Sequence, residues 1–316
     1  MSQQTVLSAN QGQPQGNRDG TITYWRRFLW HKPAVLSLIL LVIFAAACTA
    51  APLFEIWLGA EMEQVNLMAR YAPPSPEHPL GTDELGRDTL IRLLYGGRIS
   101  LAVGLLAALC SAVIGTCLGI VAGYFGGRFD AVLMRLTDTV IALPLLPLLI
   151  IMAAIDPTKL GVPQDVAEST LLSFYRIVAL IALFGWTTVA RLVRGATLSL
   201  KRREFIIAAE ALGAGPWRVM LRHILPNVFS PIVVATTLSI GNIILLESAL
   251  SFLGLGIQPP LPSWGNMLTG AQELIWEAPM LAIWPGLFIF LTVIAFNFLG
   301  DGLQDALDPR SSGFRR

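Results

Sequence analysis

The stretch PAVLSLILLVIFAAACTAAPLF, residues 33–54, contains no charged side chain. A helix rises about 1.5 Å per residue, so a segment of this length crosses a hydrocarbon core about 30 Å thick. Inside a bilayer the backbone must satisfy its own hydrogen bonds, and a helix does so within one segment. We therefore expect a first membrane-spanning helix here.

The composition of the rest of the chain favours the same environment. Hydrophobic residues make up 54% of the sequence and charged residues only 14%, whereas charged residues are about 25% of a soluble domain. Five further charge-poor stretches are long enough to span a membrane, at residues 99–124, 132–155, 170–192, 228–254 and 279–300. The expected fold class is all-α, a polytopic membrane protein with about six transmembrane helices.

Prolines and glycines lie within these predicted spans. Pro144, Pro147 and Pro285 are expected to interrupt their helices, which suits a gated cavity. Small residues, Gly104, Gly115 and Gly119, permit close helix contact within the bundle or against a partner.

The distribution of positive charge predicts the orientation. Most of the 22 Lys and Arg residues fall in alternate connections, including a cluster between Arg191 and Arg222. Positive residues concentrate on the cytoplasmic side, so both termini are expected to be cytoplasmic. The predicted organisation is a cytoplasmic tail (1–33), a first transmembrane helix with an outer segment (34–98), a five-helix core (99–301) with a cytoplasmic loop at about 193–227, and a cytoplasmic C-terminal tail (302–316).

Several function classes lack their sequence signals. The net charge of +1 argues against nucleic-acid binding. Cys48, Cys110 and Cys117 lie in apolar runs without metal-site spacing, so we expect no metal ligands. No GxSxG, HExxH or P-loop pattern occurs, so the chain is expected to have no catalytic residues, to bind no cofactor and not to be an enzyme.

The cytoplasmic loop contains REFIIAAEALGAGPWRVMLRHILPN, residues 203–227, which predicts two short helices around a bend. Alanines favour the first helix, Gly213 suits its end, and Pro216 suits the first turn of the second. Leu225 and Pro226 are expected to end that second helix. From this pattern alone, an ordinary loop on the membrane surface is an equal alternative.

This segment resembles the EAA loop of bacterial ABC importer permeases, with the motif E-A-A, three residues, G, nine residues, then I-x-L-P. The resemblance implies a type I ABC importer permease fold and a coupling helix that docks into a groove on a cytoplasmic ATPase. Two positions depart from the motif: Ile207 replaces the usual glutamate and His223 a common isoleucine. The residues that we assign to the coupling loop are Ala208, Ala209, Glu210, Leu212, Gly213, Trp217, Leu225 and Pro226.

Further motifs resemble those of dipeptide, oligopeptide and nickel permeases, and specifically the C-type subunit. They are HPLGTDELGRDTLIRLLYGGRISLAVG (78–104), AGYFGGRFD (122–130), RLTDTVIALP (135–144), SALSFLGLGIQPPLPSWGNML (248–268) and FNFLGDGLQDALDPR (296–310).

The resemblance implies a subunit of a dipeptide or oligopeptide importer in the bacterial inner membrane. Its expected partners are a second permease, two ATPase subunits that hydrolyse ATP, a periplasmic or lipid-anchored binding protein, the peptide substrate and membrane lipid. Nickel or another small solute is an alternative cargo. A gradient-driven secondary transporter and a passive scaffold are rival interpretations, although no internal repeat supports the former.

The outer motif contains Gly81, Asp83, Gly86, Arg87 and Asp88. The glycines are expected at turns, and the three charged residues are expected to form a charge-assisted cluster. Such a cluster could brace the outer mouth or meet a delivering protein.

Two carboxylates within predicted spans are candidates for the translocation path. Asp138 can instead pair with Arg135, three residues earlier on the same helix, and this structural role is favoured. For Glu247 the two alternatives, lining the path or forming an interhelical hydrogen bond, have equal weight.

Overall fold

The computed structural model describes residues 26–167, 169–269 and 275–307. Across these ranges the chain forms an elongated bundle of long helices joined by short helical turns, with one isolated β-bridge between Thr82 and Asp88. The principal helices are α2 (Lys32–Thr49), α3 (Ala51–Leu58), α4 (Thr89–Phe125), α5 (Gly127–Ala142), α6 (Leu145–Ala154), α7 (Gln164–Ala167), α8 (Thr170–Leu200), α9 (Glu204–Ala211), α10 (Pro216–Val219), α11 (Leu225–Phe252) and α13 (Met280–Leu307). Short 3-10 turns cover Leu67–Ala69, Pro157–Leu160 and Asn266–Leu268.

Within the described ranges, five helical segments are long and apolar enough to cross a membrane. A sixth candidate is the pair α5 and α6, if the two halves together make one span. The prediction of an all-α protein with about six spans is confirmed. The helices α4 and α8 are longer than their predicted spans, because each extends past the apolar run into polar sequence.

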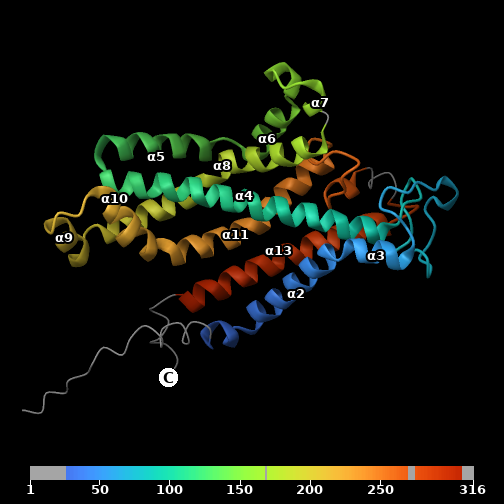
Figure 1. Cartoon of the computed structure of the whole chain (residues 1–316), viewed down its shortest axis with the longest axis horizontal. Helices are drawn as coiled ribbons and strands as arrows, with labels where there is room; N and C mark the ends of the chain where they lie inside the picture. Colours follow the sequence, from blue (N-terminus) through green and yellow to red (C-terminus); the bar gives the residue numbers. More distant parts are fainter. Residues whose placement is uncertain (1–25, 168, 270–274, 308–316) are drawn as a thin grey trace, which may run out of the picture.

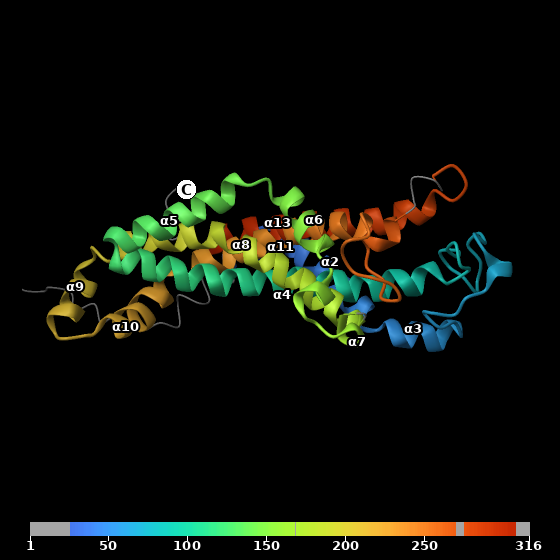
Figure 2. The same ribbon diagram turned by 90° about the horizontal axis from the view of Figure 1, so that it is seen from above.

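The bundle has two distinct ends (Figure 1). Helices α9 and α10 form one end, and α3 with the outer segment forms the other. The start of α2 and the end of α13 lie toward the α9 end. Seen from above, α5 runs over the bundle from the α9 end toward its middle (Figure 2).

Helices α4 and α8 are in close contact along their C-terminal halves. A Cβ added at Gly115 would lie 2.5 Å from the carbonyl oxygen of Trp186, and one at Gly119 would lie 2.6 Å from that of Ala190. Only glycine therefore lets the two backbones approach this closely. The side chain of Ile244 in α11 likewise packs against Gly104, where an added Cβ would lie 2.7 Å from Ile244 Cγ1. The predicted packing role of these three glycines is confirmed.

The third predicted span, 132–155, is not one continuous helix. Helices α5 and α6 meet at an angle of 85° around Leu143 and Pro144. A residue before proline avoids the helical region, and Leu143 accordingly has an extended ψ of 138°. Pro147 then lies in the first turn of α6, where no backbone donor is needed.

The predicted interruption at Pro144 is confirmed, but two other expectations about prolines are wrong. Leu225 and Pro226 do not end a helix, because α10 continues through a π-turn (Met220–Ile224) into α11. The N–H of Leu225 donates to the carbonyl of Met220, and this wider turn accommodates a proline that lacks a donor. Pro285 does not interrupt its helix either, since α13 is continuous around it.

The first predicted span, 33–54, also ends earlier than expected. Helix α2 stops at Thr49, and α3 begins at Ala51 with Pro52 in its first turn. Pro52 cannot donate a backbone hydrogen bond, so the first helix ends before it and a new helix begins with Pro52 in its first turn.

The α4–α8 contact predicts a specific sensitivity to added volume. We expect Gly119→Ala to lower the free energy of unfolding by about 1–3 kcal/mol, because its methyl group meets a backbone oxygen. The matched control is Gly195→Ala in α8, where the added methyl meets open space and alanine favours helix. Thermal unfolding of the solubilised protein measures both variants. Equal midpoints for the two would contradict the packing role.

Candidate functional site

The loop between α8 and α11 contains the predicted coupling residues. Helix α9 ends in a Schellman turn, in which Gly213 donates to the carbonyl of Glu210 at 2.9 Å and Ala214 to that of Ala209 at 3.0 Å. Gly213 has a φ of +87°, which is unfavourable for residues with a side chain. The chain then turns directly into Pro216 at the start of α10. The two predicted helices and the bend at Gly213 are confirmed.

Apolar side chains at the tip of this loop are exposed. Leu212 is 89% exposed and Trp217 is 67% exposed. Ile207, at the position where a glutamate is usual, adds a third exposed apolar side chain. Several exposed apolar side chains on one short loop favour a protein–protein contact surface. We call Phe205, Ile207, Leu212, Trp217 and Leu221 the apolar tip.

The opposite face of the loop is attached to the bundle. Ile206 is fully buried among residues of α8, α10 and α11. The hydroxyl of Tyr124 donates to Glu210 at 2.9 Å, and Lys201 donates to the backbone carbonyl of Tyr124 at 2.7 Å. Glu210 therefore holds α9 against the end of α4.

The remaining predicted loop residues have different positions. Ala208 is exposed and Ala209 half-buried in α9, while Leu225 and Pro226 lie in the first turn of α11. The last two are thus at the base of the loop and not at its bend.

The sequence predicted that Asp138 pairs with Arg135, and this prediction is wrong. The carboxylate of Asp138 accepts a hydrogen bond from Arg191 of α8. A second pair, missed in the sequence, joins the same helices: Arg194 binds both carboxylate oxygens of Asp130, with Nη2–Oδ2 at 2.6 Å. The charged residues themselves are visible in the sequence, but the two partners of each pair lie more than 50 residues apart.

Arg176 is another residue whose role the sequence did not indicate. From the N-terminal half of α8 its guanidinium donates to the carbonyls of Ala153 and Ile155, the latter at 2.9 Å. A cation at a helix C-terminus satisfies unpaired carbonyls and complements the helix dipole. Arg176 thereby fixes the end of α6.

At the opposite end of the molecule, the outer motif forms a compact turn. Asp83 accepts hydrogen bonds from the backbone and side chain of Arg87, the latter at 2.8 Å, and pairs with Arg92 at 3.3 Å. The predicted cluster is thus correct for Asp83 and Arg87. Asp88 differs, because it caps α4 through Ile91 N–H and contacts His78 at 3.0 Å.

The glycines of the outer motif are at turns, as expected. Gly81 has a φ of +79° and Gly86 a φ of +71°. At Gly81 an added Cβ would lie 2.6 Å from the carbonyl oxygen of Ala72, so the two segments that contain these residues pack closely.

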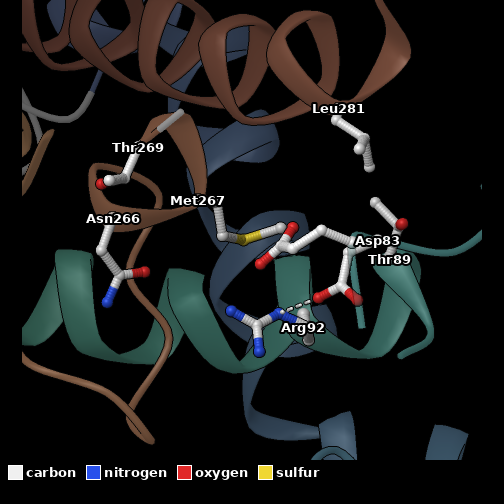
Figure 3. Close-up of a pocket in the computed structure, with 8 residues that line it drawn as sticks. Asp83, Thr89, Arg92, Asn266, Met267, Thr269 and Leu281 are labelled. Carbon is white, nitrogen blue, oxygen red and sulfur yellow. Dashed lines mark ion pairs between the residues drawn. The ribbon is translucent and has the colours of Figure 1, made fainter. Parts of the chain in front are cut away.

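A small pocket lies between the outer motif and the connection before α13 (Figure 3). Its volume of about 40 Å³ has room for water but not for a peptide. Its lining residues are Asp83, Glu84, Thr89, Arg92, Asn266, Met267, Thr269 and Leu281.

Glu247 lies deep in α11 and is fully buried. Its carboxylate accepts hydrogen bonds from Ser100 of α4 at 3.1 Å and from Ser251 at 2.7 Å. This is the interhelical hydrogen bond that was one of its two predicted alternatives. Among the described residues, no group of three or more His, Cys, Asp or Glu side chains could hold a metal ion.

Two family models match the chain. Residues 115–313 match the binding-protein-dependent transport system inner membrane component, and residues 23–74 match the N-terminal transmembrane domain of oligopeptide transport permease C. The first match includes the whole loop with the apolar tip.

Curated relatives match over nearly the full length. The glutathione transport system permease protein GsiD of Pectobacterium atrosepticum is 42% identical over 91% of this chain and 90% of its own length. The dipeptide transport system permease protein DppC of Alkalihalophilus pseudofirmus is 40% identical over 89% and 86%. The oligopeptide transport system permease protein OppC of Bacillus subtilis is 35% identical over 96% and 95%.

The two α5–α8 ion pairs predict unequal effects on stability. The Asp130–Arg194 pair is bidentate and half-buried, so Arg194→Ala should cost about 1–3 kcal/mol of unfolding free energy. Arg191→Ala removes a pair whose side chains are 48% and 62% exposed, and should cost less than about 1 kcal/mol.

Thermal unfolding of the solubilised protein compares these two variants. The exchange Asp130→Arg with Arg194→Asp should recover part of the loss. A larger effect at Arg191 than at Arg194 would contradict the assignment.

Proposed function

This chain belongs to the family of binding-protein-dependent transport system inner membrane components, and we propose its function from that premise. Members of this family are membrane-spanning permease components of ABC importers and not enzymes. The proposal is that the chain is the C-type permease subunit of an importer of dipeptides or short oligopeptides. The relatives are named for dipeptide, oligopeptide and glutathione transport, and these cargoes are all short peptides.

The observation that supports ATP coupling is the apolar tip. Leu212 and Trp217 project from a tight turn whose other face is fixed to the bundle by Ile206 and Glu210. A rigid loop with exposed apolar anchors suits insertion into a groove on another protein. We assign this groove to a cytoplasmic ATPase subunit.

The proposed assembly contains a second, different permease, two ATPase subunits and a periplasmic or lipid-anchored binding protein. The chain itself holds no nucleotide, and the ATPase subunits bind and hydrolyse ATP. The binding protein delivers the peptide to the outer face, and the two permeases together enclose its path. Surrounding lipid covers the remaining apolar surface.

Force reaches the membrane helices along two continuous connections. Helix α8 leads into the loop on one side, and α10 continues without a break into α11 on the other. When ATP closes the ATPase pair, displacement of the loop therefore moves α8 and α11 together. The ion pairs at Arg191 and Arg194 transmit the motion of α8 to α5. In the proposed mechanism, this movement opens the peptide path alternately to the two sides of the membrane.

Loss of one anchor should uncouple the subunit. We expect Trp217→Ala to reduce copurification of the ATPase subunits by about ten-fold, as for a buried aromatic anchor at an interface. The control, Trp276→Ala, removes the same residue type at the far end, where it is 92% exposed, and should leave copurification unchanged. Retention of the ATPases by the Trp217→Ala protein would contradict the docking role.

The proposed orientation places the termini and the apolar tip in the cytoplasm. In intact cells that express this chain without the ATPase subunits, a membrane-impermeant thiol reagent should label Met68→Cys, in the outer segment, but not Leu212→Cys. Both side chains are highly exposed, at 99% and 89%, so reactivity reports sidedness. After cell lysis both variants should react. Labelling of Leu212→Cys in intact cells would reverse the orientation.

A further inference from the structure

Glu247 and the outer loop are connected by a chain of hydrogen bonds that the coupling mechanism does not use. The loop, residues 254–265, connects α11 to the 3-10 turn before α13 and carries Trp264. Trp264 is fully buried, and its indole N–H donates to the carbonyl of Leu93 in α4 at 3.0 Å. The loop is therefore packed against the helices of the bundle through Trp264.

Both ends of this loop are held by serine hydroxyls. The backbone N–H of Ile257 donates to Ser251 Oγ at 3.0 Å, and that of Trp264 donates to Ser100 Oγ at 3.2 Å. Each serine in turn donates to Glu247, Ser251 to Oε1 at 2.7 Å and Ser100 to Oε2 at 3.1 Å. All three side chains are buried, with exposures of 0–1%.

The hydrogen bonds of this chain run in one direction, from the loop amides through the serines to Glu247. Each serine hydroxyl has one hydrogen to donate and lone pairs to accept. Each hydroxyl gives its hydrogen to one oxygen of Glu247, and its lone pairs accept the loop amide. Both ends of the loop therefore depend on acceptance by Glu247.

Other features favour an acceptor at this place. Two more serines, Ser248 and Ser263, border the same carboxylate. A carboxylate removed from water is costly unless donors satisfy it, and hydroxyl groups here supply them. Gly265 lets the loop approach α11 closely, since an added Cβ would lie 2.5 Å from Ser248 Cα.

We infer that Glu247 is a positioning residue that fixes both ends of the outer loop through Ser251 and Ser100. The loop leads directly into Asn266, Met267 and Thr269, which form one wall of the outer pocket opposite Arg92 (Figure 3). Glu247 thus sets the shape of the outer face from a buried position.

Hydrogen exchange of the assembled, purified complex tests the anchor. Glu247→Gln keeps the size of the side chain but accepts at one oxygen only, so amide exchange in residues 254–265 should rise about ten-fold. Ser251→Ala should raise exchange near Ile257 alone, and Ser100→Ala should raise it near Trp264 alone. These milder variants keep the test informative where the glutamine variant fails to assemble.

The matched control is Ser111→Ala, which removes a buried hydroxyl of α4 that has no hydrogen-bond partner in the described part of the chain. Its exchange in residues 254–265 should equal that of the unmodified protein. Unchanged exchange in the assembled Glu247→Gln complex would overturn the inference, because the loop would then not depend on acceptance at both oxygens of Glu247. Unchanged exchange in both serine variants would also overturn it.

A functional measurement separates positioning from general stability, and it rests on the proposed function. In proteoliposomes, Ser251→Ala and Ser100→Ala should lower the ratio of binding-protein-stimulated to basal ATP hydrolysis, whereas Ser111→Ala should not. An unchanged ratio together with faster exchange would overturn the role in shaping the outer face. Absence of stimulation in the unmodified complex would instead contradict the proposed function, while the exchange result would still test the anchor.

Discussion

Helix α4 meets α8 through glycines, and this contact sets the register of both ends of the molecule. Gly115 and Gly119 leave no space for a Cβ against the carbonyls of α8. Because backbone atoms are in contact, one helix cannot slide along the other without a clash. The outer motif continues directly into α4, and the loop with the apolar tip continues directly from α8. The α4–α8 contact therefore holds the two functional ends at a fixed separation.

The broken span depends on the same helix. Its first half, α5, is held by Arg191 and Arg194, and its second half, α6, is held by Arg176. All three arginines belong to α8, so each half is attached to α8 independently. The bend at Pro144 removes the direct helical connection between the halves. In the proposed mechanism, a displacement of α8 is thus communicated to α5 and α6 at separate points.

The sequence predicted the helices well, because charge-free runs leave a bilayer-spanning backbone few alternatives. It also predicted the turn at Gly213, where the chemistry is local. It also predicted the break at Pro144, but it failed at Pro226 and Pro285, which are accommodated inside helices. Propensity alone does not distinguish these cases. Only the neighbouring carbonyls and the π-turn do so.

The partners of buried and half-buried charges were the other gap. Asp138 was assigned to Arg135 by helical spacing, but it binds Arg191 across the bundle. The network around Glu247 joins residues about 150 positions apart in the sequence, with Ser100 in a different helix. Such pairings follow from helix packing and are not encoded in local periodicity. The hydrogen bond between Tyr124 and Glu210 was not predicted, for the same reason.

The central claim is that ATP hydrolysis by partner subunits drives a short peptide through this permease. The most direct measurement is uptake of a labelled dipeptide by proteoliposomes that contain this chain, its partner permease and the ATPases, with binding protein outside and ATP inside. The account predicts uptake that requires ATP and the binding protein together. Uptake by this chain alone, driven by an ion gradient without ATP, would contradict it.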